Sequence, residues 1–109
     1  MRRNEAIEIT TFRLVKGCTT ARFVDANRDV DAWLRQQPGF RSRRITVQQD
    51  GKVTDVLVWD SVEQAESSMR RLMHELAGSP VHALIDQRTV SWNASPVIHR
   101  VAIRAGSRG

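Results

Sequence analysis

The first part of the chain changes from a period-two pattern of apolar residues to a helical pattern. Within residues 6–14, the positions Ile7, Ile9 and Thr11 alternate with Glu8, Thr10 and Phe12. This alternation predicts a strand whose two faces are both partly apolar. After a turn in which Thr19 or Thr20 is the N-cap, one helix is predicted over residues 21–37, ending at Pro38-Gly39. Its apolar stripe consists of Phe23, Val30, Trp33 and Leu34.

A β-hairpin is predicted next, because Asp50-Gly51 separates two further segments of β-type composition. The two strands are expected over residues 40–49 and 52–59. A two-residue turn would make them antiparallel neighbours and would place Gln49 opposite Lys52.

The second half of the chain contains a clear amphipathic helix. Its apolar residues recur at spacings of three and four, at Val62, Ala65, Met69, Leu72, Met73 and Leu76. Its start has two alternative capping boxes, formed by Asp60 with Glu63 or by Ser61 with Gln64. The helix is expected to end at Gly78, and a short helical turn follows over residues 79–84. The last strand is predicted over residues 89–97.

The element order β-α-β-β-α-β predicts one ferredoxin-like α+β domain, with a four-stranded antiparallel sheet and two helices on one face. The domain covers residues 1–109, with a core of about 6–97 and a basic C-terminal tail over 98–109. The first and third strands are apolar on both faces, so the face without helices also needs a cover. We therefore expect a homodimer through the sheet face, a dimeric α/β barrel. An interface of roughly 1,600 Å² would be sufficient.

The net charge of +5, from 17 Lys and Arg against 12 Asp and Glu, leaves nucleic acid or an anionic ligand open. The arginines are scattered, however, with Arg2, Arg3, Arg104 and Arg108 in the tails and Arg41, Arg43 and Arg44 clustered in the domain. RNA-recognition domains of this topology need exposed aromatic residues on the first and third strands. Here Phe12 alone suits that role, and Asp55 lies in the middle of the third strand. We therefore do not expect nucleic acid as a partner.

Other classes of protein and site receive no support from the sequence. The apolar runs are too short to span a membrane, and no apolar segment follows the N-terminal arginines as a secretory signal would require. Cys18 is the single cysteine, which excludes an internal disulfide and fits the reducing cytoplasm. No metal site is expected, since the three histidines lack partners at ligand spacing.

Two short motifs resemble those of the antibiotic biosynthesis monooxygenase family. Residues 58–65, Val-Trp-Asp-Ser-Val-Glu-Gln-Ala, are similar to the W-x-S-x-E-x-A junction between third strand and second helix, and Pro38-Gly39-Phe40 is similar to the P-G-F entry to the second strand. The similarity covers roughly residues 6–97. It implies a dimeric ferredoxin-like barrel. Family members include cofactor-independent oxygenases of polycyclic aromatic substrates, haem-degrading enzymes and proteins with no assigned reaction.

The candidate catalytic residues are Trp59 and His82. The resemblance implies that Trp59 lines a pocket, where an indole can stack on a flat substrate and donate one hydrogen bond. His82 could act as a general base on a phenol or hydrogen-bond a ligand. Candidate substrate-binding residues are Arg13, Met73, Trp92 and Asn93. The alternative interpretations are core packing for Trp59 and Met73 and plain solvation for the polar side chains.

No cofactor is expected. In the haem-degrading branch a first-strand asparagine works with a later histidine, and these positions correspond here to Phe12 and Asp86; only a shifted alignment would offer His82. The chain also lacks tyrosine, which aromatic-oxidising members commonly have in the pocket. Two functions remain: a cofactor-independent monooxygenase acting on a small aromatic or quinol-type substrate, or a non-catalytic, dimeric, stress-related protein that binds a small hydrophobic or aromatic ligand.

Overall fold

The computed structural model of the protein describes residues 4–103. The tail arginines Arg2, Arg3, Arg104 and Arg108 lie outside the described residues. The strands are β1 (Ala6–Leu14), β2 (Phe40–Val47), β3 (Val53–Trp59) and β4 (Ile85–Pro96). The helices are α1 (Thr20–Ala26), α2 (Arg28–Leu34), α3 (Val62–Glu75) and α4 (Val81–Leu84).

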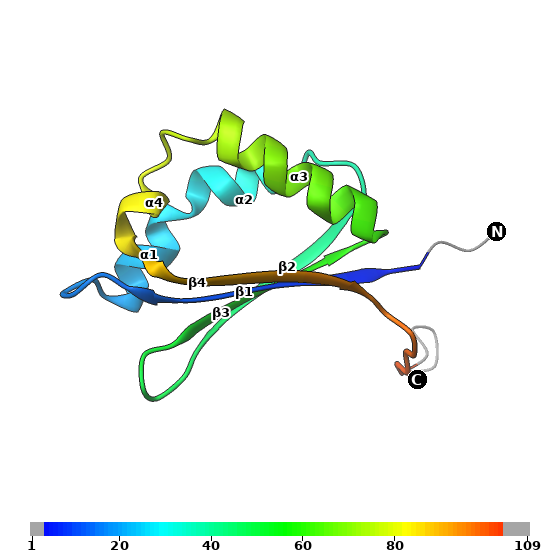
Figure 1. Cartoon of the computed structure of the whole chain (residues 1–109), viewed down its shortest axis with the longest axis horizontal. Coiled ribbons are helices and arrows are strands. Elements are labelled where there is room, and N and C mark those ends of the chain that lie inside the picture. The colour runs from blue at the N-terminus through cyan, green and yellow to red at the C-terminus, as the bar shows by residue number, and fades with distance from the viewer. Residues whose placement is uncertain (1–3, 104–109) are drawn as a thin grey trace.

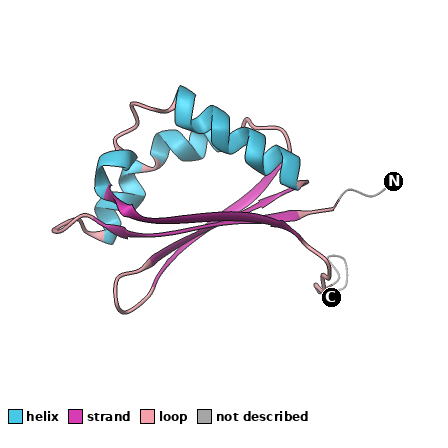
Figure 2. Ribbon diagram, viewed as in Figure 1, coloured by secondary structure: helices cyan, strands magenta, loops and turns pink. Residues whose placement is uncertain are grey.

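The strands form one antiparallel sheet in the order β2-β3-β1-β4, and all helices lie over one face of it (Figure 1). The two layers are equally clear when the chain is coloured by secondary structure (Figure 2). This is the ferredoxin-like α+β arrangement that the sequence predicts. The core between the layers includes Ala6, Phe12, Phe23, Leu34, Val53, Trp59 and Ala65, all nearly inaccessible to solvent.

The face of the sheet without helices has an apolar centre. Ile7 pairs with Val58 and Ile9 pairs with Val56 across β1 and β3, and Ile9 is 40% exposed. Because side chains alternate along a strand, these residues lie opposite to the face that packs against the helices. The register also places on this face the charged side chain of Arg44, which pairs with Val56, and the polar side chains of Ser42, Thr46, Thr54, Thr11, Ser91 and Asn93. The predicted apolar character of both strand faces is confirmed.

The helix predicted over residues 21–37 is interrupted at Asn27, so that part of the prediction is wrong. The backbone N–H of Asn27 donates to the carbonyl of Val24, three residues back, at 3.1 Å. Its side-chain Nδ2 donates to the carbonyl of Phe23 at 2.9 Å, and its Oδ1 accepts a hydrogen bond from Arg43. Asparagine side chains compete in this way with helical hydrogen bonds. The partner on β2 is distant in sequence, which is why periodicity did not reveal the break.

The hairpin register also differs from the prediction by one residue. Val47 pairs with Val53, and the N–H of Gln48 donates to the carbonyl of Lys52 at 2.9 Å, so Gln48 rather than Gln49 lies opposite Lys52. Gly51 has a φ of +91° and donates to the carbonyl of Gln48. This is a three-residue loop with glycine in the left-handed region, the next most common hairpin geometry after the two-residue turn.

Other element boundaries resolve alternatives left open by the sequence. Thr19 is the N-cap of α1, and Ser61 rather than Asp60 is the N-cap of α3, its hydroxyl accepting from the N–H of Gln64 at 3.2 Å. The last strand begins at Ile85, immediately after α4, rather than at residue 89. The early start is possible because Ile85 pairs with Leu14 at the end of β1.

The two motifs that carry the family resemblance contact each other. The N–H of Asp60 donates to the carbonyl of Gly39 at 2.8 Å, and the rings of Phe40 and Trp59 pack edge to face with centroids 5.5 Å apart. Gly39 has a φ of +84°, and a Cβ built there would overlap the amide end of the Gln64 side chain. The P-G-F and W-x-S-x-E-x-A segments therefore form one packed corner where β2, β3 and α3 meet.

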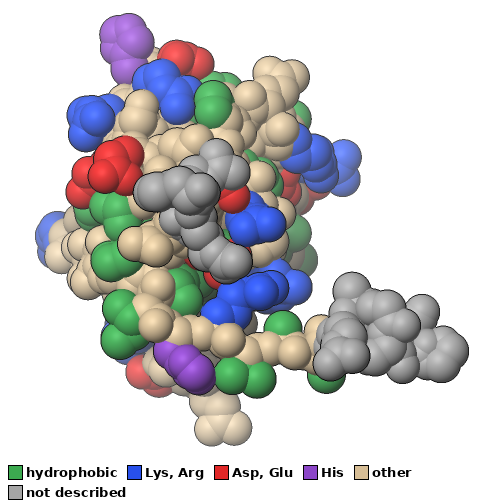
Figure 3. Space-filling model, turned by 90° about the vertical axis from the view of Figure 1, so that its right-hand side faces the viewer, with side chains coloured by type: hydrophobic (Ala, Val, Ile, Leu, Met, Phe, Trp, Pro, Cys, Tyr) green, Lys and Arg blue, Asp and Glu red, His purple; other side chains and the backbone are tan. Residues whose placement is uncertain are grey.

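On the face of the molecule seen in Figure 3, acidic and basic side chains lie among hydrophobic and other side chains. No helix within residues 4–103 has the length and apolar character needed to cross a membrane.

Candidate functional site

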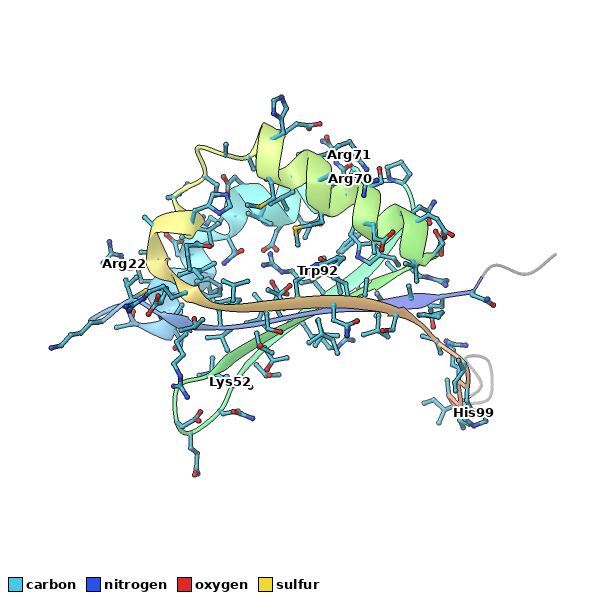
Figure 4. All side chains as sticks on the ribbon, in the orientation of Figure 1. Arg22, Lys52, Arg70, Arg71, Trp92 and His99 are labelled. Atoms are coloured by element: carbon cyan, nitrogen blue, oxygen red, sulfur yellow. The ribbon has the colours of Figure 1, made fainter. Side chains whose placement is uncertain are left out.

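A cavity of about 400 Å³ lies between the sheet and the helices. Most of its lining is apolar and comes from β1, β3, β4, the N-terminal helices and α3. The lining includes Phe12, Phe23, Val30, Leu34, Leu57, Met69, Leu72, Met73, Val90 and Trp92. Trp92 projects from β4 toward the helical layer (Figure 4). Volume and apolar lining are those of a site for a small organic ligand.

Glu8 lines this cavity from the middle of β1 and is only 4% exposed. Its carboxylate accepts a hydrogen bond from the indole N–H of Trp59 at 2.7 Å on Oε1, and one from Trp92 at 2.6 Å on Oε2. Burial raises the pKa of Glu8 above its ordinary value of 4.5, and the two indole hydrogen bonds oppose this effect without cancelling it.

Strand pairing explains why two indoles reach the same carboxylate. Ala6 pairs with Trp59 on β3, and Thr10 pairs with Trp92 on β4. The two tryptophans therefore flank Glu8 diagonally, one from each neighbouring strand. Sequence reasoning did not select Glu8. The available signal was its position on the same strand face as Phe12, where a charged residue needs a partner.

A second polar group in the cavity is built around Arg43 of β2. Arg43 donates from Nε and Nη2 to the two oxygens of Asp55, at 3.0 and 2.7 Å, and from Nη1 to Asp31 at 2.8 Å. Its Nη2 also donates to Oδ1 of Asn27 at 2.8 Å. Burial acts to lower the pKa of Arg43, but the hydrogen bonds and charges of Asp55 and Asp31 outweigh it, so the pKa lies above its usual value. This group joins the sheet to the helical break at Asn27.

Four of the residues selected from the sequence lie at or next to the cavity. Met73, His82 and Trp92 line it, whereas Trp59 is 1% exposed and reaches it through its hydrogen bond to Glu8. The Nε2 atom of His82 lies 2.9 Å from the carbonyl oxygen of Leu76, so this ring nitrogen is engaged by the backbone.

Arg13 and Asn93 lie elsewhere. Arg13 donates to the carbonyl oxygen and to the carboxylate of Asp50 in the hairpin loop, at 2.7 and 3.1 Å. Asn93 pairs with Ile9 on the face without helices and accepts a hydrogen bond from the hydroxyl of Ser95 at 2.8 Å. The structure thus does not bring these two side chains together with the other candidates.

Phe12 and Asp86, the positions that correspond to the residues of the haem-degrading enzymes, both have structural partners. Phe12 is 2% exposed and packs against Phe23 in the core, and Asp86 is ion-paired with Arg88 at 3.1 Å. Among the described residues, no group of three or more His, Cys, Asp or Glu side chains is arranged to hold a metal ion.

Comparison with protein-family models found no match, and neither did a comparison with the curated proteins. Solved structures of the same fold were found. A variant of SnoaB, a cofactor-independent oxygenase from Streptomyces nogalater, superimposes with a TM-score of 0.70 at 15% identity, over 90% of this chain and 97% of that chain. The ActVA-Orf6 monooxygenase from Streptomyces coelicolor, solved with the ligand nanaomycin D, gives 0.62 at 20% identity, over 92% and 93%.

A protein from Nitrosomonas europaea, named provisionally as an antibiotic biosynthesis monooxygenase, has a TM-score of 0.69 at 12% identity, over 94% of this chain and 98% of that chain. The resemblance predicted from the two motifs is thus supported by likeness in fold over nearly the whole chain. At these identities the likeness concerns the fold, and the chain has the ferredoxin-like fold of these oxygenases.

Proposed function

We propose that this protein is a cofactor-independent monooxygenase that binds a small aromatic or quinol-type substrate in the cavity between sheet and helices. The observation that carries the proposal is an apolar cavity of about 400 Å³ with a carboxylate, Glu8, in its lining. SnoaB is named as a cofactor-independent oxygenase and ActVA-Orf6 was solved with nanaomycin D, which supports the same type of reaction on the same fold.

The chemistry requires proton removal and exclusion of water. A substrate CH₂ group activated by aromatic rings loses a proton, and the resulting carbanion gives electrons to O₂. A carbon–oxygen bond forms, and the O–O bond then breaks with loss of water. One oxygen atom remains as a carbonyl, so the four-electron oxidation of CH₂ to C=O balances the four-electron reduction of O₂. The substrate supplies all electrons, and no cofactor is needed.

The side chains at the cavity divide into contact and orienting groups. Met73 and Trp92 line the cavity, are 55% and 36% exposed, and could pack on a planar ring. We assign Trp59 an orienting role, because its N–H is committed to Glu8. His82 remains a candidate for hydrogen bonding to a polar substituent through its other ring nitrogen.

We also propose that two copies of the chain pack through the open face of the sheet. The support is the apolar centre formed by Ile7, Ile9, Val56 and Val58, which the helices leave uncovered. Burial of these side chains would stabilise a dimer at roughly 25 cal/mol per Å². The single cysteine favours a reducing compartment, and we place the protein in the cytoplasm.

A non-catalytic ligand-binding protein is the second candidate function. It is favoured by the commitment of polar atoms to protein partners, since Nε2 of His82 lies against a carbonyl and Asp55 pairs with Arg43. RNA binding receives less support, because Phe12, the one aromatic residue considered for stacking on bases, is buried in the core.

Two measurements on the same protein distinguish these functions. Quenching of tryptophan fluorescence by anthrone or 1,4-dihydroxynaphthalene reports binding, with Trp92 as the indole nearest the entering ring. Oxygen uptake above the protein-free rate, in the presence of a metal chelator, reports oxygenation. Binding with uptake supports the oxygenase, and binding without uptake supports the ligand-binding protein. Absence of binding across a panel of such compounds would contradict both.

A further inference from the structure

We propose that Glu8 is the proton acceptor of this site and that Trp59 and Trp92 are its positioning residues. The inference rests on the proposed function, because it assigns a role in that reaction. It starts from an arrangement that core packing does not require: a buried carboxylate on an inward-facing strand position, fixed by two indole N–H groups and lining a cavity.

The geometry leaves Glu8 able to accept a further hydrogen. Each carboxylate oxygen has two lone-pair directions, and each receives one indole N–H, at 2.7 and 2.6 Å. Each oxygen can therefore accept one further hydrogen bond or a proton. Because the two donors approach from opposite neighbouring strands, they fix the carboxylate plane and set where a substrate hydrogen must lie.

The electrostatics suit a base rather than a structural anion. Among the described residues, the titratable side chains that line the cavity with Glu8 are Arg43, Asp55 and His82. Arg43 directs its donors at Asp55, Asp31 and Asn27, so Glu8 has no ion-pair partner at hydrogen-bond distance. Burial and, to a smaller extent, the negative charge of Asp55 raise the pKa of Glu8, whereas the two indole hydrogen bonds and the positive charge of Arg43 act to lower it; the net direction is upward.

The other titratable groups of the cavity are less suited to this role. Both oxygens of Asp55 are occupied by the guanidinium of Arg43, which would have to be displaced before Asp55 could receive a proton. Nε2 of His82 lies 2.9 Å from the carbonyl oxygen of Leu76. Glu8 thus combines access to the cavity with free acceptor capacity.

In the reaction, Glu8 takes a proton from the substrate CH₂ group, and the carbanion combines with O₂ to give a peroxide anion. The protonated Glu8 gives its proton to the peroxide anion, and the carboxylate then removes the second hydrogen of the former CH₂ carbon as a proton, while the carbonyl forms, the O–O bond breaks and hydroxide leaves. The protonated Glu8 then returns its proton to the hydroxide, and water leaves. The carboxylate is regenerated, and no further reductant or oxidant enters.

The test separates proton removal from oxygen chemistry. Anthrone in D₂O without oxygen should exchange its CH₂ hydrogens faster with the protein than without it, as followed by NMR. Glu8→Gln should lower this protein-dependent rate by roughly 100-fold or more, the usual contribution of a general base. Glu8→Asp should retain part of the rate.

Glu75→Gln is the matched control. Glu75 accepts a hydrogen bond from the indole of Trp33 at 2.9 Å, so it reproduces the carboxylate–indole pair outside the cavity. The Glu75→Gln variant should catalyse the exchange of the anthrone hydrogens at the same rate as the wild type. The assignment of Glu8 as proton acceptor would be overturned if Glu8→Gln catalysed exchange as fast as the wild type, or if the wild type did not accelerate exchange at all. If the wild type catalyses exchange under anaerobic conditions but shows no oxygen uptake in the aerobic measurement, the proposed oxygenase activity is contradicted, whereas the assignment of Glu8 as proton acceptor is retained.

A second variant covers the case in which Glu8→Gln does not fold. Trp92→Phe removes one of the donors that stabilise the carboxylate and changes a residue that is 36% exposed. It should raise the midpoint of the pH profile of exchange, because the pKa of Glu8 rises when an N–H donor to its charged form is lost. An unchanged midpoint would exclude the positioning role of Trp92.

Discussion

Arg43 donates two hydrogen bonds to the two carboxylate oxygens of Asp55 on the neighbouring strand, and both side chains are nearly buried. Asp55, whose position in the middle of a strand argues against RNA binding, is the partner of a buried arginine in this structure. The same guanidinium also bonds Asp31 and Asn27, so one side chain connects β2 and β3 with the break between α1 and α2.

Replacement of Arg43 by methionine should destabilise the protein strongly. Asp55 would remain buried without its counter-ion, and breaking a buried pair in this way costs about 3–5 kcal/mol. Arg43→Lys should recover only part of the loss, because an ammonium cannot make the two parallel hydrogen bonds. Urea unfolding followed by circular dichroism measures both changes. The control is Arg28→Met, which removes the exposed ion pair with Asp25 and should change the unfolding free energy little. Similar effects of the two methionine variants would contradict the prediction.

Gly39→Ala should destabilise more than the same change at another glycine with positive φ. In addition to the strain of a φ of +84°, the new methyl group at Gly39 would displace the amide end of the Gln64 side chain, which accepts a hydrogen bond from the hydroxyl of Ser61 at 3.2 Å. At Gly17 the φ is +86° and the Cβ would meet nothing within 4 Å, so only the backbone cost of about 1–2 kcal/mol applies. Thermal unfolding of both variants gives the comparison. Equal losses would mean that the contact between the two motifs relaxes freely.

Glu8 should make folding stability depend on pH in a direction opposite to that of a salt-bridged carboxylate. Its folded-state pKa is raised above 4.5, so the native state binds more protons than the unfolded state between these two pKa values. The contribution of Glu8 is therefore most favourable below pH 4.5 and declines as pH rises through the folded-state pKa. The free energy of unfolding of the wild type minus that of Glu8→Gln, measured from pH 4 to 8, should decrease as pH rises. A difference that is constant over this range would be inconsistent with the raised pKa.

Ile9→Lys should convert the proposed dimer to a monomer. Ile9 is 40% exposed at the apolar centre of the open sheet face, and a charge there would have to be buried between two sheets. Native mass spectrometry or sedimentation should give twice the mass of one chain for the wild type and a single mass for the variant. The control is Val24→Lys, at a 56% exposed position on α1, which should leave the mass unchanged. A monomeric wild type would remove the sheet-to-sheet interface.

The order of helices and strands could be predicted because residue spacing and capping residues within each segment indicate its type. The spacing of Val62 to Leu76 indicated a helix, the alternation around Ile7 and Ile9 indicated a strand, and Thr19 and Ser61 marked helix starts. The one-residue error in the hairpin register arose because Asp50-Gly51 is compatible with both a two-residue turn and a three-residue loop. The extra residue becomes visible only when Gln48 is seen to bond Lys52.

The candidate site was predicted only in part. Trp59, His82, Met73 and Trp92 do gather at or beside the cavity, because their elements converge there. Arg13 and Asn93 have their structural partners on other surfaces, in the hairpin loop and on the open face.

By itself the sequence determined the order of helical and strand segments and the apolar character of both sheet faces, since these depend on residues near one another in the chain; it did not predict the break at Asn27 or the start of β4 at Ile85. Only the tertiary structure decided that Trp59 and Trp92 share the carboxylate of Glu8, and that Arg43 bonds Asn27 at the break between α1 and α2. Trp92 is 84 residues from Glu8, and strand pairing joins them. A buried charge must find its partners in space, and one chain pattern is compatible with many such pairings.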